Sequence, residues 1–190
     1  MGIRFTQYNL TMTNDTIDKL EYALAFKRIS LQKPVKKVTV HDIEAETTVP
    51  QRRFYECFAD QYELIVWYCN YAGEQLVRHN IKKDWSEIAN LMINDISTYS
   101  AFYRSLFDAE ERPDLIYPLY DFTFRFMKMY AELRDNTLTD NDLFLLDFIT
   151  AGSIYVVKTW LLDTDCAMNT GPLTTKLVSA YPVVMKGIFK

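Results

Sequence analysis

The sequence predicts an all-α protein, in which an N-terminal three-helix helix-turn-helix domain is followed by a larger helical domain. Apolar residues recur at helical spacings along most of the chain, and no alternating pattern is long enough to predict a strand. The first sixty residues also contain two short helices separated by a tight turn, which is a helix-turn-helix arrangement. We place the two domains at residues 1–60 and 61–190.

Composition and charge narrow the class of protein. The 190 residues are 49% hydrophobic and 24% charged, with 5 Gly and 6 Pro, which excludes a disordered chain and a collagen-like repeat. The net charge of -4 excludes a uniformly basic coat for nucleic acid. Residues 1–58 contain nine basic and seven acidic residues, whereas the rest contains twelve and eighteen. A polyanion would therefore meet the N-terminal domain.

The first helix is predicted to start at Thr13 or Asn14, either of which can cap it. It ends near Gln32, because Pro34 disfavours helical geometry in the residue before it. Its apolar face consists of Ile17, Leu20, Leu24 and Leu31.

Two short helices follow. Thr39 and Asp42 form a variant capping box that begins a helix ending near Thr47. Pro50 suits the first turn of the next helix, since its missing N–H is not needed there, and Thr48–Gln51 predicts a second capping box. The small core expected behind this pair consists of Val38, Ile43, Val49, Phe54 and Phe58.

The rest of the chain is predicted to be a series of helices. They are a long helix from Asp60, Asp84–Tyr99, Ala101–Phe107, Pro113–Arg134, a helix capped at Thr139 that runs to Leu162, and Pro172–Lys186. The stretch Leu143–Leu162 is about long enough to cross a bilayer. Because it contains Asp147 and Lys158, we expect a buried helix and no membrane partner.

The residues around the short helices resemble the TetR family of bacterial regulators. The resemblance is carried by Val38–Ile43, Val49, Arg52–Tyr55, Phe58 and Asp60–Ile65. A weaker likeness continues in Thr150–Ile154 and Thr159–Leu162, which are similar to a late stretch in the subgroup that includes dihydroxyacetone-kinase-operon activators.

The resemblance implies a homodimeric transcriptional regulator that binds double-stranded DNA at a palindromic operator. Thr39 is expected to cap its helix and donate to a phosphate. Gln51, Arg52 and Arg53 are expected to reach base edges or phosphates, and Tyr55 to contact the backbone or a thymine methyl group. Packing is the alternative for Tyr55, and a solvated helix face is the alternative for the two arginines.

The resemblance also implies a small organic effector and a dimer interface in the larger domain. The candidate ligand-binding residues are Trp67, Tyr71, Tyr99, Tyr103, Tyr120, Phe124 and Met127. Ordinary core packing is the alternative for each of them. The candidate dimer-interface residues are Ile149, Gly152, Val156, Trp160, Leu173, Leu177 and Val184. A helical glycine costs about 1 kcal/mol relative to alanine, and close helix–helix approach at Gly152 would offset that cost.

Several positions depart from the TetR pattern. They are Thr47–Thr48 in place of Ala-Gly, Pro50 in place of Ser, Arg53 in place of Thr, Glu56, Cys57 in place of His, and Gln61 in place of Lys. Taken together, these changes remove phosphate donors and add a negative charge, which weakens DNA affinity. The alternative function is therefore a TetR-shaped co-regulator whose degenerate head binds a partner or ligand rather than DNA alone.

Catalytic chemistry is not expected. The two histidines lack metal-ligand spacing, and the chain has no Cys-x-x-Cys, no glycine-rich phosphate loop and no Gly-x-Ser-x-Gly motif. We therefore expect no enzyme, no cofactor and no metal. Residues 1–14 do not resemble a secretory signal, and three cysteines are typical of reduced thiols, so we expect a cytoplasmic protein.

Overall fold

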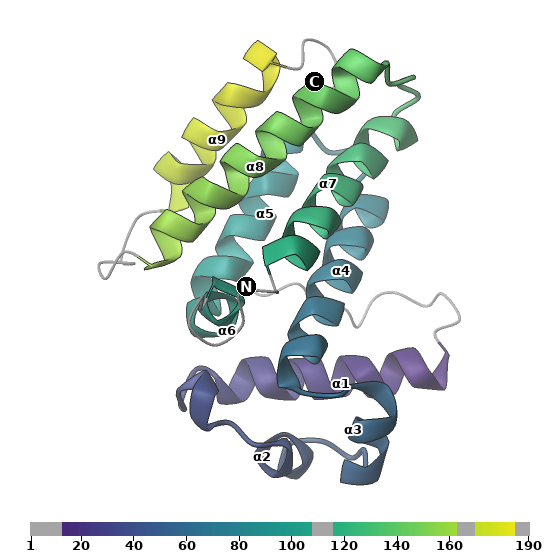
Figure 1. The fold of residues 1–190 in the computed structure, drawn as a ribbon, viewed down its shortest axis with the longest axis vertical. Helices are drawn as coiled ribbons and strands as arrows, with labels where there is room; N and C mark the ends of the chain where they lie inside the picture. The colour runs from purple at the N-terminus through teal and green to yellow at the C-terminus, as the bar shows by residue number, and fades with distance from the viewer. Residues whose placement is uncertain (1–12, 108–115, 163–169, 185–190) are drawn as a thin grey trace.

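The computed structural model describes residues 13–107, 116–162 and 170–184, and this part of the chain contains helices and no strand (Figure 1). The all-α prediction is confirmed. The helices are α1 (Asn14–Ile29), α2 (Val40–Ala45), α3 (Gln51–Cys57), α4 (Gln61–His79), α5 (Trp85–Thr98), α6 (Ser100–Arg104), α7 (Ile116–Leu133), α8 (Asp140–Leu162) and α9 (Thr170–Val184). Short 3₁₀ turns occupy Val35–Lys37 and Ser105–Phe107. The predicted ends at Pro113 and Lys186 lie outside the described residues.

The first three helices form a head at one end of the molecule. Helix α1 lies across this end, with α2 and α3 on its outer side (Figure 1). Helix α4 begins at the head and rises into a body that also contains α5, α7, α8 and α9 (Figure 1). Because α1 packs against α2, α3 and α4, it is the element that joins the head to the body.

Side-chain caps define where the head helices start. Thr13 accepts a hydrogen bond from the Thr16 N–H at the start of α1. The predicted capping box of α2 is confirmed, since the Thr39 hydroxyl accepts from the Asp42 N–H and the Asp42 carboxylate accepts from the Thr39 N–H. Asp60 accepts from two backbone N–H groups at the start of α4.

The predicted capping box at Thr48–Gln51 is wrong. Pro50 itself is the N-cap residue of α3 and makes no side-chain cap bond. The Thr48 hydroxyl instead donates to the Glu21 carboxylate of α1 at 3.1 Å. The turn therefore bonds to α1 rather than to the helix that it precedes.

The core is continuous from the head into the body. The five residues predicted for the head core are all buried, which confirms that prediction. They join a cluster that includes Phe26 of α1, Tyr68 of α4 and Phe102 of α6. The Phe102 ring meets the other two edge-on, with centroids 5.5 Å and 5.7 Å away. A displacement of α4 or α6 therefore acts on α1 through direct packing.

Acid should destabilise the head and the start of α8. Hydrogen bonds from Lys33 and Thr39 hold the pKa of Asp42 well below its ordinary value, and Thr139 lowers the pKa of Asp142 in the same way. A carboxylate with a lowered folded-state pKa stabilises the fold above its ordinary pKa, and this stability is lost as the pH falls. We expect the midpoint of thermal unfolding, followed by circular dichroism, to fall steadily between about pH 5 and pH 2.

Asp42→Asn should lower the midpoint at pH 6 and flatten its dependence on pH. Asp121→Asn, on an exposed part of α7, is the control. It should leave the fall of the thermal midpoint with decreasing pH unchanged. If the thermal midpoint fell with decreasing pH equally in Asp42→Asn and the wild type, the stabilising role of the Asp42 carboxylate would be contradicted.

Candidate DNA-binding surface and effector cavity

The outer side of the head presents most of the residues predicted to contact DNA. The Arg52 side chain is 92% exposed on α3, and Tyr55, one turn further on, is 60% exposed. Gln51 is half-buried at the first position of α3, and Thr39 is exposed at the N-cap of α2. Four of the five predicted side chains are therefore accessible from solvent.

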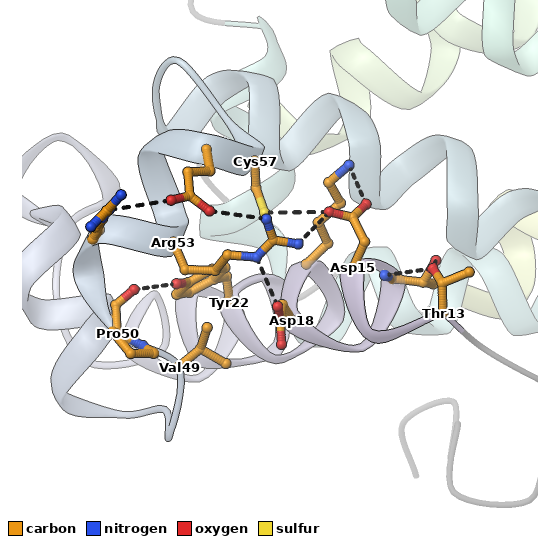
Figure 2. Close-up of polar contacts among 12 residues, drawn as sticks. Thr13, Asp15, Asp18, Tyr22, Val49, Pro50, Arg53 and Cys57 are labelled. Carbon is orange, nitrogen blue, oxygen red and sulfur yellow. Dashed lines mark hydrogen bonds and ion pairs between the residues drawn. The ribbon is translucent and has the colours of Figure 1, made fainter.

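Arg53 differs from the other four because its guanidinium group points toward α1 (Figure 2). Nη2 lies 2.6 Å from Asp15 Oδ1, and Nε lies 2.9 Å from Asp18 Oδ2. Nη1 contacts Glu56 at 3.2 Å, and the side chain is only 30% exposed. This geometry favours an internal role for Arg53, joining α3 to α1, over the expected contact with DNA.

A second bond fixes the start of α3 on α1. The Tyr22 hydroxyl donates to the Pro50 carbonyl at 2.8 Å (Figure 2). The buried Tyr22 ring also meets Phe54 edge-on, with centroids 5.2 Å apart. Pro50 and Arg53 therefore attach α3 to α1 at two successive points.

The turn between α2 and α3 does not require glycine. Asp135 is the one non-glycine residue with a positive φ in the described part of the chain, so Thr47 and Thr48 avoid the left-handed region. The Thr47 hydroxyl lies within hydrogen-bond distance of the carbonyls of Glu44 and Val49. Threonine is therefore accommodated at both positions without conformational strain.

The two neighbouring arginines should behave differently when they are replaced. We expect Arg53→Gln to lower the midpoint of thermal unfolding by about 2–4 °C, because it leaves Asp15 and Asp18 without their shared cation. Arg52→Gln is the matched control and should leave the midpoint unchanged, since its side chain is solvated. Equal midpoints for the two variants in calorimetry would contradict the internal role of Arg53.

Three basic residues of the head were not among the predicted contacts. Lys36 and Lys37 are exposed in the turn before α2, and the His41 side chain is exposed on α2 itself. Their closeness to Thr39 in the sequence is the signal that could have found them. They widen the polar surface around the start of α2.

The body contains an apolar cavity of about 100 Å³ between its helices. Its wall includes Trp85, Met92, Tyr103, Phe126, Met127 and Leu161. Tyr103 and Met127 are thus the two predicted ligand-binding residues that line this cavity.

The other five predicted ligand-binding residues lie elsewhere. Trp67 and Tyr71 stack with centroids 5.2 Å apart and line a different, more polar depression. Tyr99 covers the ammonium group of Lys27, Tyr120 donates to the Asp147 carboxylate, and Phe124 packs half-buried against a second core cluster. Their aromatic character alone did not indicate which way each side chain faces.

The predicted dimer-interface residues divide between two faces. Ile149, Trp160 and Leu173 are buried inside the protomer, which corrects their assignment to an outward face. Leu177 is half-buried, Gly152 and Val156 are exposed, and the Val184 side chain lies outside the described residues. A Cβ atom added at Gly152 would meet nothing within 4 Å, so no intrachain contact demands glycine there.

Helix α8 has an exposed apolar face, of which only Val156 was predicted as an interface residue, and this corrects the expectation of a buried helix. We call it the α8 face; its residues are Phe144, Phe148, Tyr155, Val156 and Leu162. The spacings of four and seven residues are the signal that could have predicted it. Within the described ranges, α8 is also the one helix long and apolar enough to cross a membrane. Its opposite side packs against α7 and α9.

Head and body together define a class of fold: a helix-turn-helix head on an all-helical body. Residues 83–169 match a TetR family model described as "Transcriptional regulator C-terminal region". The body of this chain is therefore similar to the C-terminal regions of TetR-family regulators.

Two solved structures share this fold. The dihydroxyacetone kinase operon activator DhaS superposes with a TM-score of 0.68 at 16% identity, over 92% of this chain and 99% of DhaS. A putative TetR-family transcriptional regulator from Mesorhizobium loti superposes with a TM-score of 0.57 at 13% identity, over 91% of this chain and 98% of that one. A search of curated proteins found no match.

Proposed function

We propose that the protein is a cytoplasmic homodimeric regulator that binds a palindromic DNA operator and responds to a small effector in the body. The observation that carries the proposal is the exposure of Arg52 and Tyr55 on a recognition helix that Pro50 and Arg53 fix to α1. A rigid helix of this kind can present side chains to base edges in a major groove.

The proposed DNA contacts follow from the chemistry of the exposed residues. Arg52 is suited to guanine edges, and Tyr55 to a thymine methyl group or the sugar-phosphate backbone. Gln51 can reach adenine from the first turn of α3. Thr39, at the N-cap of α2, and Lys37, in the turn before it, can contact phosphates.

The α8 face is the proposed dimer interface. A contiguous exposed apolar patch on a folded chain is typical of an interaction site. Pairing two copies of α8 and α9 about a twofold axis would cover this face, and Gly152 would allow close approach of the helix backbones. To read successive major grooves, such a dimer must hold its two copies of α3 about 34–36 Å apart.

The experiment that tests this proposal measures binding to DNA from just upstream of the gene across a salt series. We expect specific binding whose logarithm falls linearly with the logarithm of the salt concentration, because Lys and Arg displace counterions from phosphates. An unrelated DNA of equal length is the control. Equal affinity for both DNAs would overturn the operator-binding function.

One observation favours the alternative function, in which the protein is a co-regulator whose head binds a partner or ligand rather than DNA alone. Asp15, Asp18 and Glu56 neutralise Arg53, and Glu56 also lies 3.4 Å from Arg52, so the head carries less free positive charge than its arginines suggest. This reading predicts operator binding only after cell extract is added. Binding by the purified protein alone would exclude it.

A further inference from the structure

A lysine of the head is buried among residues of the body. The Lys27 side chain of α1 is 3% exposed, and Asp95 of α5, its ion-pair partner, is 6% exposed. The Lys27 Nζ atom lies 2.7 Å from Asp95 Oδ2 and 2.9 Å from the Tyr68 hydroxyl of α4. One ammonium group therefore links three helices, one from the head and two from the body.

Aromatic rings enclose the same ammonium group. Its nitrogen lies 4.1 Å from the centroid of the Tyr99 ring and 4.6 Å from that of Tyr68. Burial lowers the pKa of Lys27, and the Asp95 carboxylate opposes this effect. Because well-packed apolar residues can replace a buried ion pair with no loss of stability, stability alone is a poor reason for this cluster.

The cluster also contacts the wall of the cavity. The Tyr103 hydroxyl donates to the same Asp95 Oδ2 atom at 2.5 Å, and Tyr103 lines the cavity. Ile93 and Ile96, on either side of Asp95 in α5, line it as well. A continuous path therefore runs from the cavity through Tyr103 and Asp95 to Lys27 of the head.

The chemistry of the wall restricts what the cavity can hold. Carbon dominates the lining, and no side chain that contributes to it within the described residues carries a charge. The Thr123 hydroxyl already donates to the Leu119 carbonyl at 2.7 Å. A charged ligand would lose its hydration without gaining a partner. A volume of about 100 Å³ compares with the cavity of about 150 Å³ that holds benzene in an engineered protein.

We propose that this cavity binds an uncharged apolar molecule about the size of a single ring, and that Tyr103, Asp95 and Lys27 transmit its binding to α1. The proposal rests on the effector role proposed above for the cavity. A ligand that displaces Tyr103 or α5 moves Asp95. Separating Lys27 from Asp95 would leave two buried charges unpaired, which is strongly unfavourable. Helix α1, which carries Lys27, therefore moves together with Asp95.

The first experiment tests the ligand class by NMR of methyl-labelled methionines. Toluene and benzoate are the probes, since they have similar shapes and only benzoate is charged. We expect toluene to shift the methyl signals of Met92 and Met127, which line the cavity, and to leave that of Met129 unchanged. Benzoate should shift none of them. Equal responses to the two probes, or no response to toluene, would overturn the ligand class.

A cavity-filling variant locates the binding site. Ala89→Leu adds three carbons to the wall and should abolish the response to toluene. Asn90→Leu adds a similar side chain at the next, exposed position of α5 and should preserve it. A response of Ala89→Leu equal to that of Asn90→Leu would place toluene outside this cavity and overturn the proposal.

The second experiment tests transmission by amide hydrogen exchange across residues 14–29, with and without toluene. In the wild type we expect toluene to change exchange rates in α1 by about threefold or more. The double variant Lys27→Met/Asp95→Asn removes both charges together, because a single change would leave the other charge buried and unpaired. In this variant toluene should still shift the Met127 methyl signal but should no longer change the amide exchange rates in α1.

The control for transmission is Arg78→Met/Glu74→Gln, which removes an exposed ion pair from α4. It should keep the full response in α1. A response in Lys27→Met/Asp95→Asn as large as that of this control would overturn the transmission path. Neither experiment contains DNA, so a failure of operator binding and a failure of this proposal are distinguishable.

Discussion

Replacing Phe148 and Tyr155 with glutamate should convert the protein into a folded monomer that no longer binds its operator. Both side chains are about two-thirds exposed on α8, so the change leaves the protomer core intact. In the proposed dimer it places four carboxylates in an apolar contact. Since central aromatic residues dominate interface energies, we expect dimerisation to weaken more than about 100-fold. Sedimentation equilibrium measures this change.

A matched control separates dimer loss from the effect of surface charge. Leu133→Glu places the same carboxylate on an exposed apolar position of α7 that is not part of the α8 face. It should leave both sedimentation and operator affinity unchanged. A Phe148→Glu/Tyr155→Glu protein that sediments as a dimer would show that the α8 face is not the interface.

The double variant Arg52→Ala/Tyr55→Ala should weaken operator binding by about 1,000-fold or more at constant salt, because good base contacts contribute about 1–3 kcal/mol each and a dimer presents each residue twice. Both side chains are exposed, so the midpoint of thermal unfolding should not change. Fluorescence anisotropy with labelled operator DNA measures the affinity.

The controls for this variant address charge and position. Arg78→Ala removes an exposed arginine from α4 and should leave operator affinity unchanged. The Arg52→Ala/Tyr55→Ala protein should keep more of its affinity for unrelated DNA than for the operator. Retention of full operator affinity would mean that these residues do not read the operator.

The helices were predictable because their signals are local. Thr39 and Asp42 are three positions apart and together define the start of α2. The internal position of Arg53 was not predictable in this way, because Asp18 and Asp15, its partners on α1, lie 35 and 38 positions earlier. A charged side chain on a short helix has the same local sequence whether it faces solvent or another helix.

The two faces of α8 illustrate a second limit. The helix is apolar around much of its circumference, so the spacing of its apolar residues does not decide which side of α8 is buried. Packing of α8 against α6, α7 and α9 leaves Ile149 and Trp160 buried and Phe148 exposed. The same limit applies to the cavity, where contacts between distant helices selected Tyr103 and Met127 from many aromatic and methionine residues.

The uncovered side of α8 has a consequence for gene dosage. When assembly precedes operator binding, the concentration of active molecules at low abundance rises with the square of the copy number, by mass action. Halving synthesis would then reduce operator occupancy about fourfold in this range. The apolar face of one helix would thereby set a threshold of expression below which the promoter is insensitive to the regulator.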